Sequence, residues 1–116
     1  MKRPHKLKGA TSRHEMCGTL FITLNEDDKG RPYELFAFGS KLGTCRSNLE
    51  GLARCISKLL QGNDLEGAID ALELIRCPAM ERKKGEARVT KERNLDEIPC
   101  SCADAMAREL KEYLKK

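Results

Sequence analysis

The residues with the clearest capacity for chemistry are the cysteines, of which the 116-residue chain contains six. In a reducing cytosol, thiols in such a chain bind metal or carry out redox chemistry more often than they form disulfides. Cys55 falls in the middle of an expected helix, one turn from Leu52 and from Leu59, and we expect it in the core as a small hydrophobic residue. The other five fall where the expected elements begin or end, so the backbone can direct their thiolates toward one point: Cys17, Cys45, Cys77, Cys100 and Cys102.

Two chemistries are open to these five thiols. Structural zinc takes four ligands in a tetrahedron, and four of the five thiolates would suffice, although the usual pairs of CxxC motifs are missing. Alternatively, Cys102 would lie in the first turn of a helix, whose dipole stabilises a thiolate, and Cys100 would be its resolving partner in a redox pair. Spacing alone leaves zinc binding, redox chemistry and the absence of any role open.

Other chemical motifs are missing from the sequence. His5 and His14 form no metal-ligand pattern, and we expect both to be exposed to solvent. There is no glycine-rich phosphate loop and no GxSxG nucleophile motif. The net charge is +4, and two stretches are locally basic, residues 1–14 and 82–93. A nucleotide or nucleic-acid binding module is therefore a lower-ranked alternative, since the interleaved aromatic residues that stack on bases are lacking.

The elements that must position the cysteines begin with strands. Residues 17–24 and 33–38 are rich in β-branched and aromatic residues, and the polar segment between them reads as a turn. The pair predicts a β-hairpin, to which residues 7–15 could add an edge strand. Within the turn, the acidic residues serve the turn itself rather than chemistry: Glu26, Asp27 and Asp28.

Helical patterns follow the hairpin. A capping box at Ser47 predicts a helix that runs to Gln61, and Asn63 or Asp64 can cap a second helix, whose apolar stripe extends to Ile75. A second capping box, Ser101-Cys102-Ala103-Asp104, predicts a closing helix. Residues 79–99 are mostly charged, with one strand-like fragment at 87–90, and we expect a flexible loop there.

These patterns predict one α+β domain over residues 1–116, with a basic, flexible leader at 1–14. A small antiparallel sheet, formed by the hairpin and the edge strand, would be packed by a helical hairpin and a C-terminal helix. Hydrophobic residues make up 40% of the chain and charged residues 34%, which excludes a disordered chain and a membrane span. No apolar run of signal-peptide length follows the charged N-terminus, so we expect a cytoplasmic protein.

Several sequence blocks occur in an order that is similar to a known family. The order resembles the TSCPD domain, found at the C-terminus of cobalamin-dependent (class II) ribonucleoside-diphosphate reductases and as short stand-alone proteins. The resemblance runs from about residue 9 to residue 114 and rests on these blocks: Cys17-Gly18-Thr19-Leu20-Phe21-Ile22-Thr23, Gly30-Arg31-Pro32-Tyr33-Glu34-Leu35-Phe36, Gly39-Ser40-Lys41, Gly43-Thr44-Cys45, Leu72-Glu73-Leu74-Ile75-Arg76-Cys77-Pro78 and Ser101-Cys102-Ala103-Asp104.

The resemblance favours zinc, because the family's recurring cysteines correspond to Cys17, Cys45, Cys77 and Cys102. It implies a four-thiolate metal site at those positions. The chain departs from the signature by reading Cys100-Ser101-Cys102-Ala103-Asp104 where Thr-Ser-Cys-Pro-Asp is expected. The alanine suits an early helical position, whereas Cys100 adds a fifth thiol that could replace Cys102 as a ligand or pair with it.

The resemblance also implies a role in deoxyribonucleotide synthesis. The full-length reductases need a large catalytic barrel and adenosylcobalamin, and this chain is too short for either, so we expect neither independent catalysis nor cobalamin binding. The implied function is that of a zinc-binding accessory domain, whose partner would be a reductase catalytic subunit or a thioredoxin-like reductant. The alternative is a redox relay, in which Cys100 and Cys102 deliver electrons to a reductase.

Overall fold

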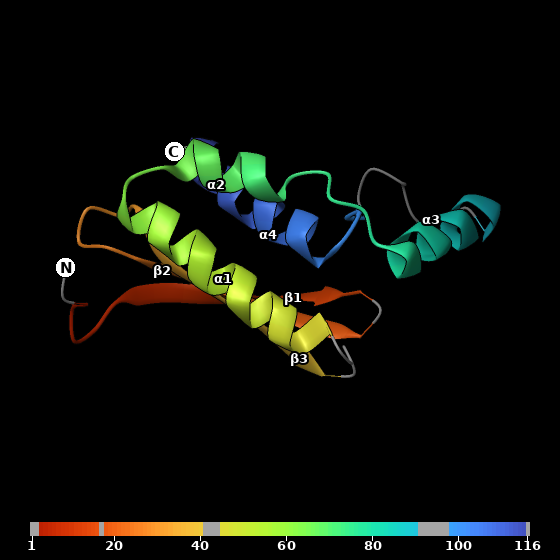
Figure 1. Cartoon of the computed structure of the whole chain (residues 1–116), viewed down its shortest axis with the longest axis horizontal. Coiled ribbons are helices and arrows are strands. Elements are labelled where there is room, and N and C mark those ends of the chain that lie inside the picture. The colour runs from red at the N-terminus through yellow and green to blue at the C-terminus, as the bar shows by residue number, and fades with distance from the viewer. Residues whose placement is uncertain (1–2, 17, 41–44, 91–97, 116) are drawn as a thin grey trace.

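The computed structural model describes residues 3–16, 18–40, 45–90 and 98–115. It confirms the predicted α+β class, with a three-stranded antiparallel sheet and helices packed against one of its faces (Figure 1). The elements in chain order are β1 (Lys8–Glu15), β2 (Thr19–Glu26), β3 (Pro32–Ser40), α1 (Cys45–Gln61), α2 (Leu65–Leu72), α3 (Pro78–Thr90), α4 (Cys102–Lys111) and a short 3-10 helix, η2 (Glu112–Lys115).

The sheet has the strand order β1-β2-β3, which confirms both the hairpin and the edge strand. Its turn is held by Asp27, whose carboxylate accepts hydrogen bonds from the amides of Lys29 and Arg31, both at 2.9 Å. This confirms that Asp27 is a turn residue. Side chains alternate along each strand, so that one face of the sheet joins the core through Leu20, Ile22, Leu24, Leu35 and Ala37.

Helices α1, α2 and α4 cover that face. Helix α1 packs on β3, and α2 packs against both α1 and α4, so α1 and α2 form the predicted helical hairpin. They contribute large, fully buried side chains, among them Ile56, Leu72, Met106 and Leu110. None of the described helices is long and apolar enough to span a bilayer.

Two predicted helix boundaries are wrong. Helix α1 begins at Cys45, so Ser47 lies inside the helix and is not its N-cap. Helix α2 ends at Leu72, and Leu74 adopts a left-handed conformation with a φ of 62°. The predicted apolar stripe therefore stops short of Ile75, and the side chains of Leu74 and Ile75 are exposed.

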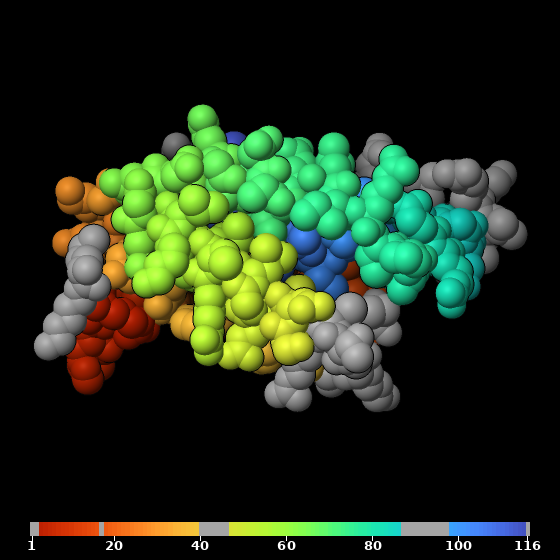
Figure 2. All heavy atoms as spheres, viewed as in Figure 1, coloured from red at the N-terminus to blue at the C-terminus, as the bar shows by residue number. Residues whose placement is uncertain are grey.

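The expected loop over residues 79–99 is wrong as far as Thr90, because α3 occupies Pro78–Thr90. The strand-like fragment at 87–90 is the end of this helix, while residues 91–97 lie outside the described part of the chain. Most residues of α3 are good helix formers, which explains a helix despite the high charge. Figures 1 and 2 show α3 at one end of the molecule, beyond the N-terminal end of α4.

Two expectations about single side chains are also wrong. Cys55 is exposed rather than part of the core, because the buried face of α1 is formed by Leu49, Ala53, Ile56 and Leu60. His5 is exposed as expected, but His14 is partly buried, and its Nε2 lies 2.8 Å from a carboxylate oxygen of Glu109. This contact joins β1 to α4.

Candidate thiol centre at the start of α4

Three cysteines meet where α3 and α4 begin. The amide of Cys77, which directly precedes α3, donates a hydrogen bond to the carbonyl of Cys100 at 3.0 Å. Cys100 is buried, whereas Cys77 and Cys102 are partly buried and pack against the core. None of the three forms a disulfide. The two segments that carry them are thus fastened side by side by their backbones.

Asp104, in the first turn of α4, organises this region. Its Oδ1 accepts a hydrogen bond from the amide of Leu74, and its Oδ2 accepts one from the amide of Cys100, both at 2.9 Å. Its own amide donates to the hydroxyl of Ser101 at 3.0 Å. The predicted capping box is therefore half right: Ser101 is the N-cap, but the Asp104 carboxylate turns to Cys100 and Leu74 instead of to the Ser101 amide.

The Asp104 carboxylate is held ionised in this buried position. Burial by itself raises its pKa, but the amides of Cys100 and Leu74 and the nearby charges of Arg108 and Lys111 outweigh burial, and the net pKa lies below its ordinary value. The Nε of Arg108 lies 3.4 Å from Oδ2. A buried anion that accepts directed backbone hydrogen bonds is a rigid support for the cysteines beside it.

Two lysines of α3 point back into the protein. The ammonium of Lys84 donates to Sγ of Cys100 at 3.2 Å, which brings a positive charge next to that sulfur. The ammonium of Lys83 donates to the carbonyls of Glu15 and Met16, at 3.0 and 3.1 Å, and so fastens α3 to the end of β1. Because these two cations serve internal contacts, they add little to the basic surface that the nucleic-acid alternative requires.

The four cysteines predicted as zinc ligands are described to different extents. Cys77 and Cys102 are seen in full, Cys17 lies outside the described residues, and only the backbone of Cys45 is described, as the first residue of α1. Among the described side chains, no three of His, Cys, Asp or Glu are grouped as metal ligands. Cys77 and Cys102 would therefore need thiols from the undescribed part to complete a zinc site.

The described residues next to Cys17 and Cys45 in the sequence lie at one end of the sheet. Thr19 pairs with Glu15 on one side and with Ser40 on the other, so the β1–β2 connection and the end of β3 share one end of the sheet. Helix α1 starts after residues 41–44, and Lys83 ties α3 to Met16 at the same end. The ends of β1 and β3 and the starts of β2, α1 and α3 thus lie at one end of the sheet (Figure 1).

Sequence reasoning missed Asp104 and Lys84 as residues of this centre. Asp104 belongs to the motif block that carries the resemblance, but its partners Leu74 and Cys100 follow only from the tertiary fold. Lys84 lies in the segment expected to be a loop, where the sequence provides no sign of a contact with Cys100.

The fold and this centre define a small α+β domain with cysteines gathered where its elements begin and end. The family model of the TSCPD domain matches residues 1–114, and the chain belongs to this family. The TSCPD domain is linked to ribonucleotide reductases. No curated protein and no solved structure matches the chain.

Proposed function

We propose that this chain is a zinc-binding accessory module of ribonucleotide reduction, with Cys17, Cys45, Cys77 and Cys102 as the metal ligands. The observation that carries the proposal is the 3.0 Å hydrogen bond between the Cys77 amide and the Cys100 carbonyl, which joins the starts of α3 and α4. The end of the sheet next to them leads into the segments with Cys17 and Cys45. Four thiolates form the closed ligand set of a structural zinc site.

Zinc bound by four thiolates would contribute folding free energy, because the ligands come from segments far apart in the sequence. The chain's own residues prepare this region: Asp104 fixes the backbones before Cys77 and Cys102, and Lys83 holds α3 against the end of β1. The proposed role of the metal is structural. The module would dock on a reductase catalytic subunit or on a thioredoxin-like reductant in the cytoplasm, and adenosylcobalamin would bind the reductase rather than this chain.

Cys102 is the better fourth ligand of the two neighbouring thiols. The sulfur of Cys100 already accepts a hydrogen bond from Lys84 and is buried, so binding zinc through it would displace that contact. Cys102 opens α4 and is partly buried beside the core. Helix N-terminal amides favour a thiolate at this position.

Elemental analysis of protein purified anaerobically without chelators tests this proposal. One zinc per chain is expected for the wild type and for Cys55→Ser, the matched control, because Cys55 is exposed on α1. Cys77→Ser and Cys102→Ser should each lose most of the zinc. A metal-free wild type, or full zinc retention in both ligand variants, would rule out the site.

The contact between Lys84 and Cys100 favours a second candidate, the redox relay. In that function Cys100 and Cys102 would lose two electrons and two protons to form a disulfide, and a disulfide of the reductase would take them up to become a dithiol. Lys84 would hold a positive charge beside the sulfur of Cys100. Reductase turnover that depends on Cys100 and Cys102 together would support the relay, and normal turnover with Cys102→Ser would exclude it.

A further inference from the structure

The contact between Lys84 and Cys100 brings an amine next to a thiol. The side-chain nitrogen of Lys84, on α3, lies 3.2 Å from the sulfur of Cys100, which belongs to the segment before α4. The two residues are 16 positions apart in the chain, so the fold rather than the local sequence places them together. Neither the zinc site nor the disulfide relay uses the Lys84 nitrogen as a reacting atom. The pair therefore has a chemical capacity that the proposed functions leave unused.

Both partners are held in position by the elements that carry them. The Cys100 amide donates to the Asp104 carboxylate at 2.9 Å, and the Cys100 carbonyl accepts from the Cys77 amide at 3.0 Å. Lys84 extends from α3, whose Met80 is fully buried in the core. Groups held this close react with each other as if one were present at very high concentration around the other.

The surroundings of the sulfur restrict the reagents that reach it. Cys100 is 9% exposed and Lys84 is half-buried. Dioxygen is small enough to reach a sulfur at this depth, whereas a bulky thiol such as glutathione is hindered. Cys102 would have to close a short disulfide ring with Cys100, and disulfide geometry is exacting. Lys84 is thus the best-placed partner for an oxidised Cys100.

We propose that Lys84 and Cys100 form a covalent N–O–S bridge when the reduced protein meets dioxygen. One S–H and one N–H bond break, one atom of dioxygen becomes the bridge, and the other leaves as water. Sulfur and nitrogen each lose two electrons, dioxygen gains four, and the additional proton of the ammonium group passes to solvent. One atom remains between nitrogen and sulfur, so the bridge requires less movement from 3.2 Å than a direct S–N bond.

The bridge is a reversible modification that fastens α3 to the segment before α4. Two equivalents of a dithiol return the four electrons, restore the thiol and the amine, and release the bridging oxygen as water. Figure 1 shows α3 at one end of the molecule, where such a link limits its movement against the rest of the fold. The bridge uses none of the four proposed zinc ligands, so it does not rest on the proposed function.

Intact-mass spectrometry tests the proposal on the full chain, purified under reducing conditions and then exposed to air. The wild type should gain about 14 Da, because one oxygen is added and two hydrogens are lost. Dithiothreitol should remove this gain. A tryptic map should show the peptide containing Lys84 joined to the peptide containing Cys100. Cys100→Ser should abolish the gain, and so should Lys84→Arg, which retains the positive charge beside the sulfur.

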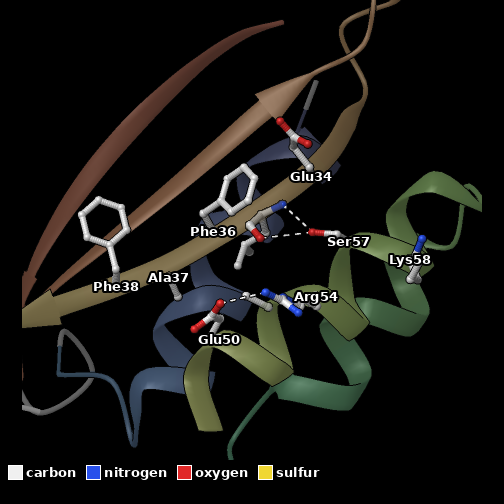
Figure 3. A pocket seen from close by; sticks show the side chains of 10 residues that line it. Glu34, Phe36, Ala37, Phe38, Glu50, Arg54, Ser57 and Lys58 are labelled. Atoms are coloured by element: carbon white, nitrogen blue, oxygen red, sulfur yellow. Dashed lines mark hydrogen bonds and ion pairs between the residues drawn. The ribbon is translucent and has the colours of Figure 1, made fainter. Parts of the chain in front are cut away.

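Two control variants change a thiol and a lysine that are not in contact with this pair. Cys55 is exposed on α1, and Lys58 lies on the same helix, at the groove of about 440 Å³ between β3 and α1 (Figure 3). None of the described cysteines lines this groove. Cys55→Ser and Lys58→Arg should therefore retain the full gain in mass.

A wild type that keeps its reduced mass in air would overturn the proposal. So would a gain that persists in Lys84→Arg or Cys100→Ser, or a map in which Cys100 occurs in a disulfide or as a sulfinic acid. The wild-type map needs no variant, so the test holds even where a variant fails to fold. Zinc content, measured on the same samples, is a separate readout, and failure of the bridge leaves the proposed metal site unaffected.

Discussion

The carboxylate of Asp104 in α4 accepts a 2.9 Å hydrogen bond from the amide of Leu74, 30 residues earlier in the chain. Its other oxygen takes the amide of Cys100 in the same way. One buried side chain thus fixes the segment that leads to Cys77 and the segment that leads to Cys102. The aspartate of the Ser-Cys-Ala-Asp block is accordingly a positioning residue for the thiols, and several predictions depend on it.

Replacing this carboxylate should destabilise the fold strongly. Asp104→Asn retains one oxygen acceptor but turns an NH₂ group toward a backbone amide, so one of the two hydrogen bonds is lost. Because hydrogen bonds to charged groups contribute about 1.5–3 kcal/mol each, we expect a loss of about 3 kcal/mol in the free energy of unfolding, measured by urea denaturation. Asp70→Asn, at an exposed site on α2, is the matched control and should change stability little. Equal effects of the two substitutions would contradict the role of Asp104.

The same carboxylate should make stability sensitive to acid. The pKa of Asp104 is lowered in the folded protein, so its stabilising contribution is fully present above the ordinary value of 3.8 and is lost as the pH falls through the folded pKa. The stability difference between wild type and Asp104→Asn should therefore shrink as the pH falls below about 4. NMR titration of the Asp104 carboxyl should give a midpoint below 3.8. A midpoint above it would show that burial, not the hydrogen bonds, dominates.

The two neighbouring thiols should differ in their importance for metal. Cys102→Ser should abolish stoichiometric zinc binding, whereas Cys100→Ser should retain it, because Cys100 is engaged by Lys84 and is not among the proposed ligands. Competition with a chromophoric zinc chelator measures both affinities. The reverse order would show that the fifth thiol has replaced Cys102 as a ligand.

Tyr113 should ionise at unusually high pH. Burial and the hydrogen bond from its hydroxyl to Glu26, 2.9 Å long, raise its pKa to about 12. Ultraviolet titration in a Tyr33→Phe background isolates this phenol. Glu26→Gln should lower the midpoint, because the neutral amide removes the negative charge that opposes ionisation, while burial keeps it above the ordinary value of 10.0. A Tyr113 midpoint near 10.0 in the Tyr33→Phe protein, with Glu26 in place, would contradict the buried hydrogen bond.

Local patterns were sufficient to predict much of the fold. Strand alternation predicts β2 and β3, the Asp27 turn fixes their connection, and Ser101 marks the start of α4. The edge strand β1 was also predicted, although its pattern of exposed residues is weak. These features are set by residues close together in the sequence, which is why sequence reasoning finds them.

The errors share a different origin. Leu74 and Ile75 continue an apolar helical stripe, which predicts that the helix includes them. In the structure the helix ends before Leu74, and the Leu74 amide donates a tertiary hydrogen bond to Asp104. Cys55 was assigned to the core because Leu52 and Leu59 lie one turn away, yet both are only partly buried, and the buried face of α1 is displaced toward Ile56. The sequence does not predict the roles of Asp104 and Lys84 in the candidate site for the same reason, because their partners come from distant segments.

X-ray absorption at the zinc edge, on protein purified anaerobically, tests the central claim most directly. The account predicts one zinc per chain surrounded by four sulfur atoms at about 2.3 Å, with no nitrogen or oxygen ligand. Absence of zinc, or a site with fewer than four sulfur ligands, would contradict a closed site formed by Cys17, Cys45, Cys77 and Cys102.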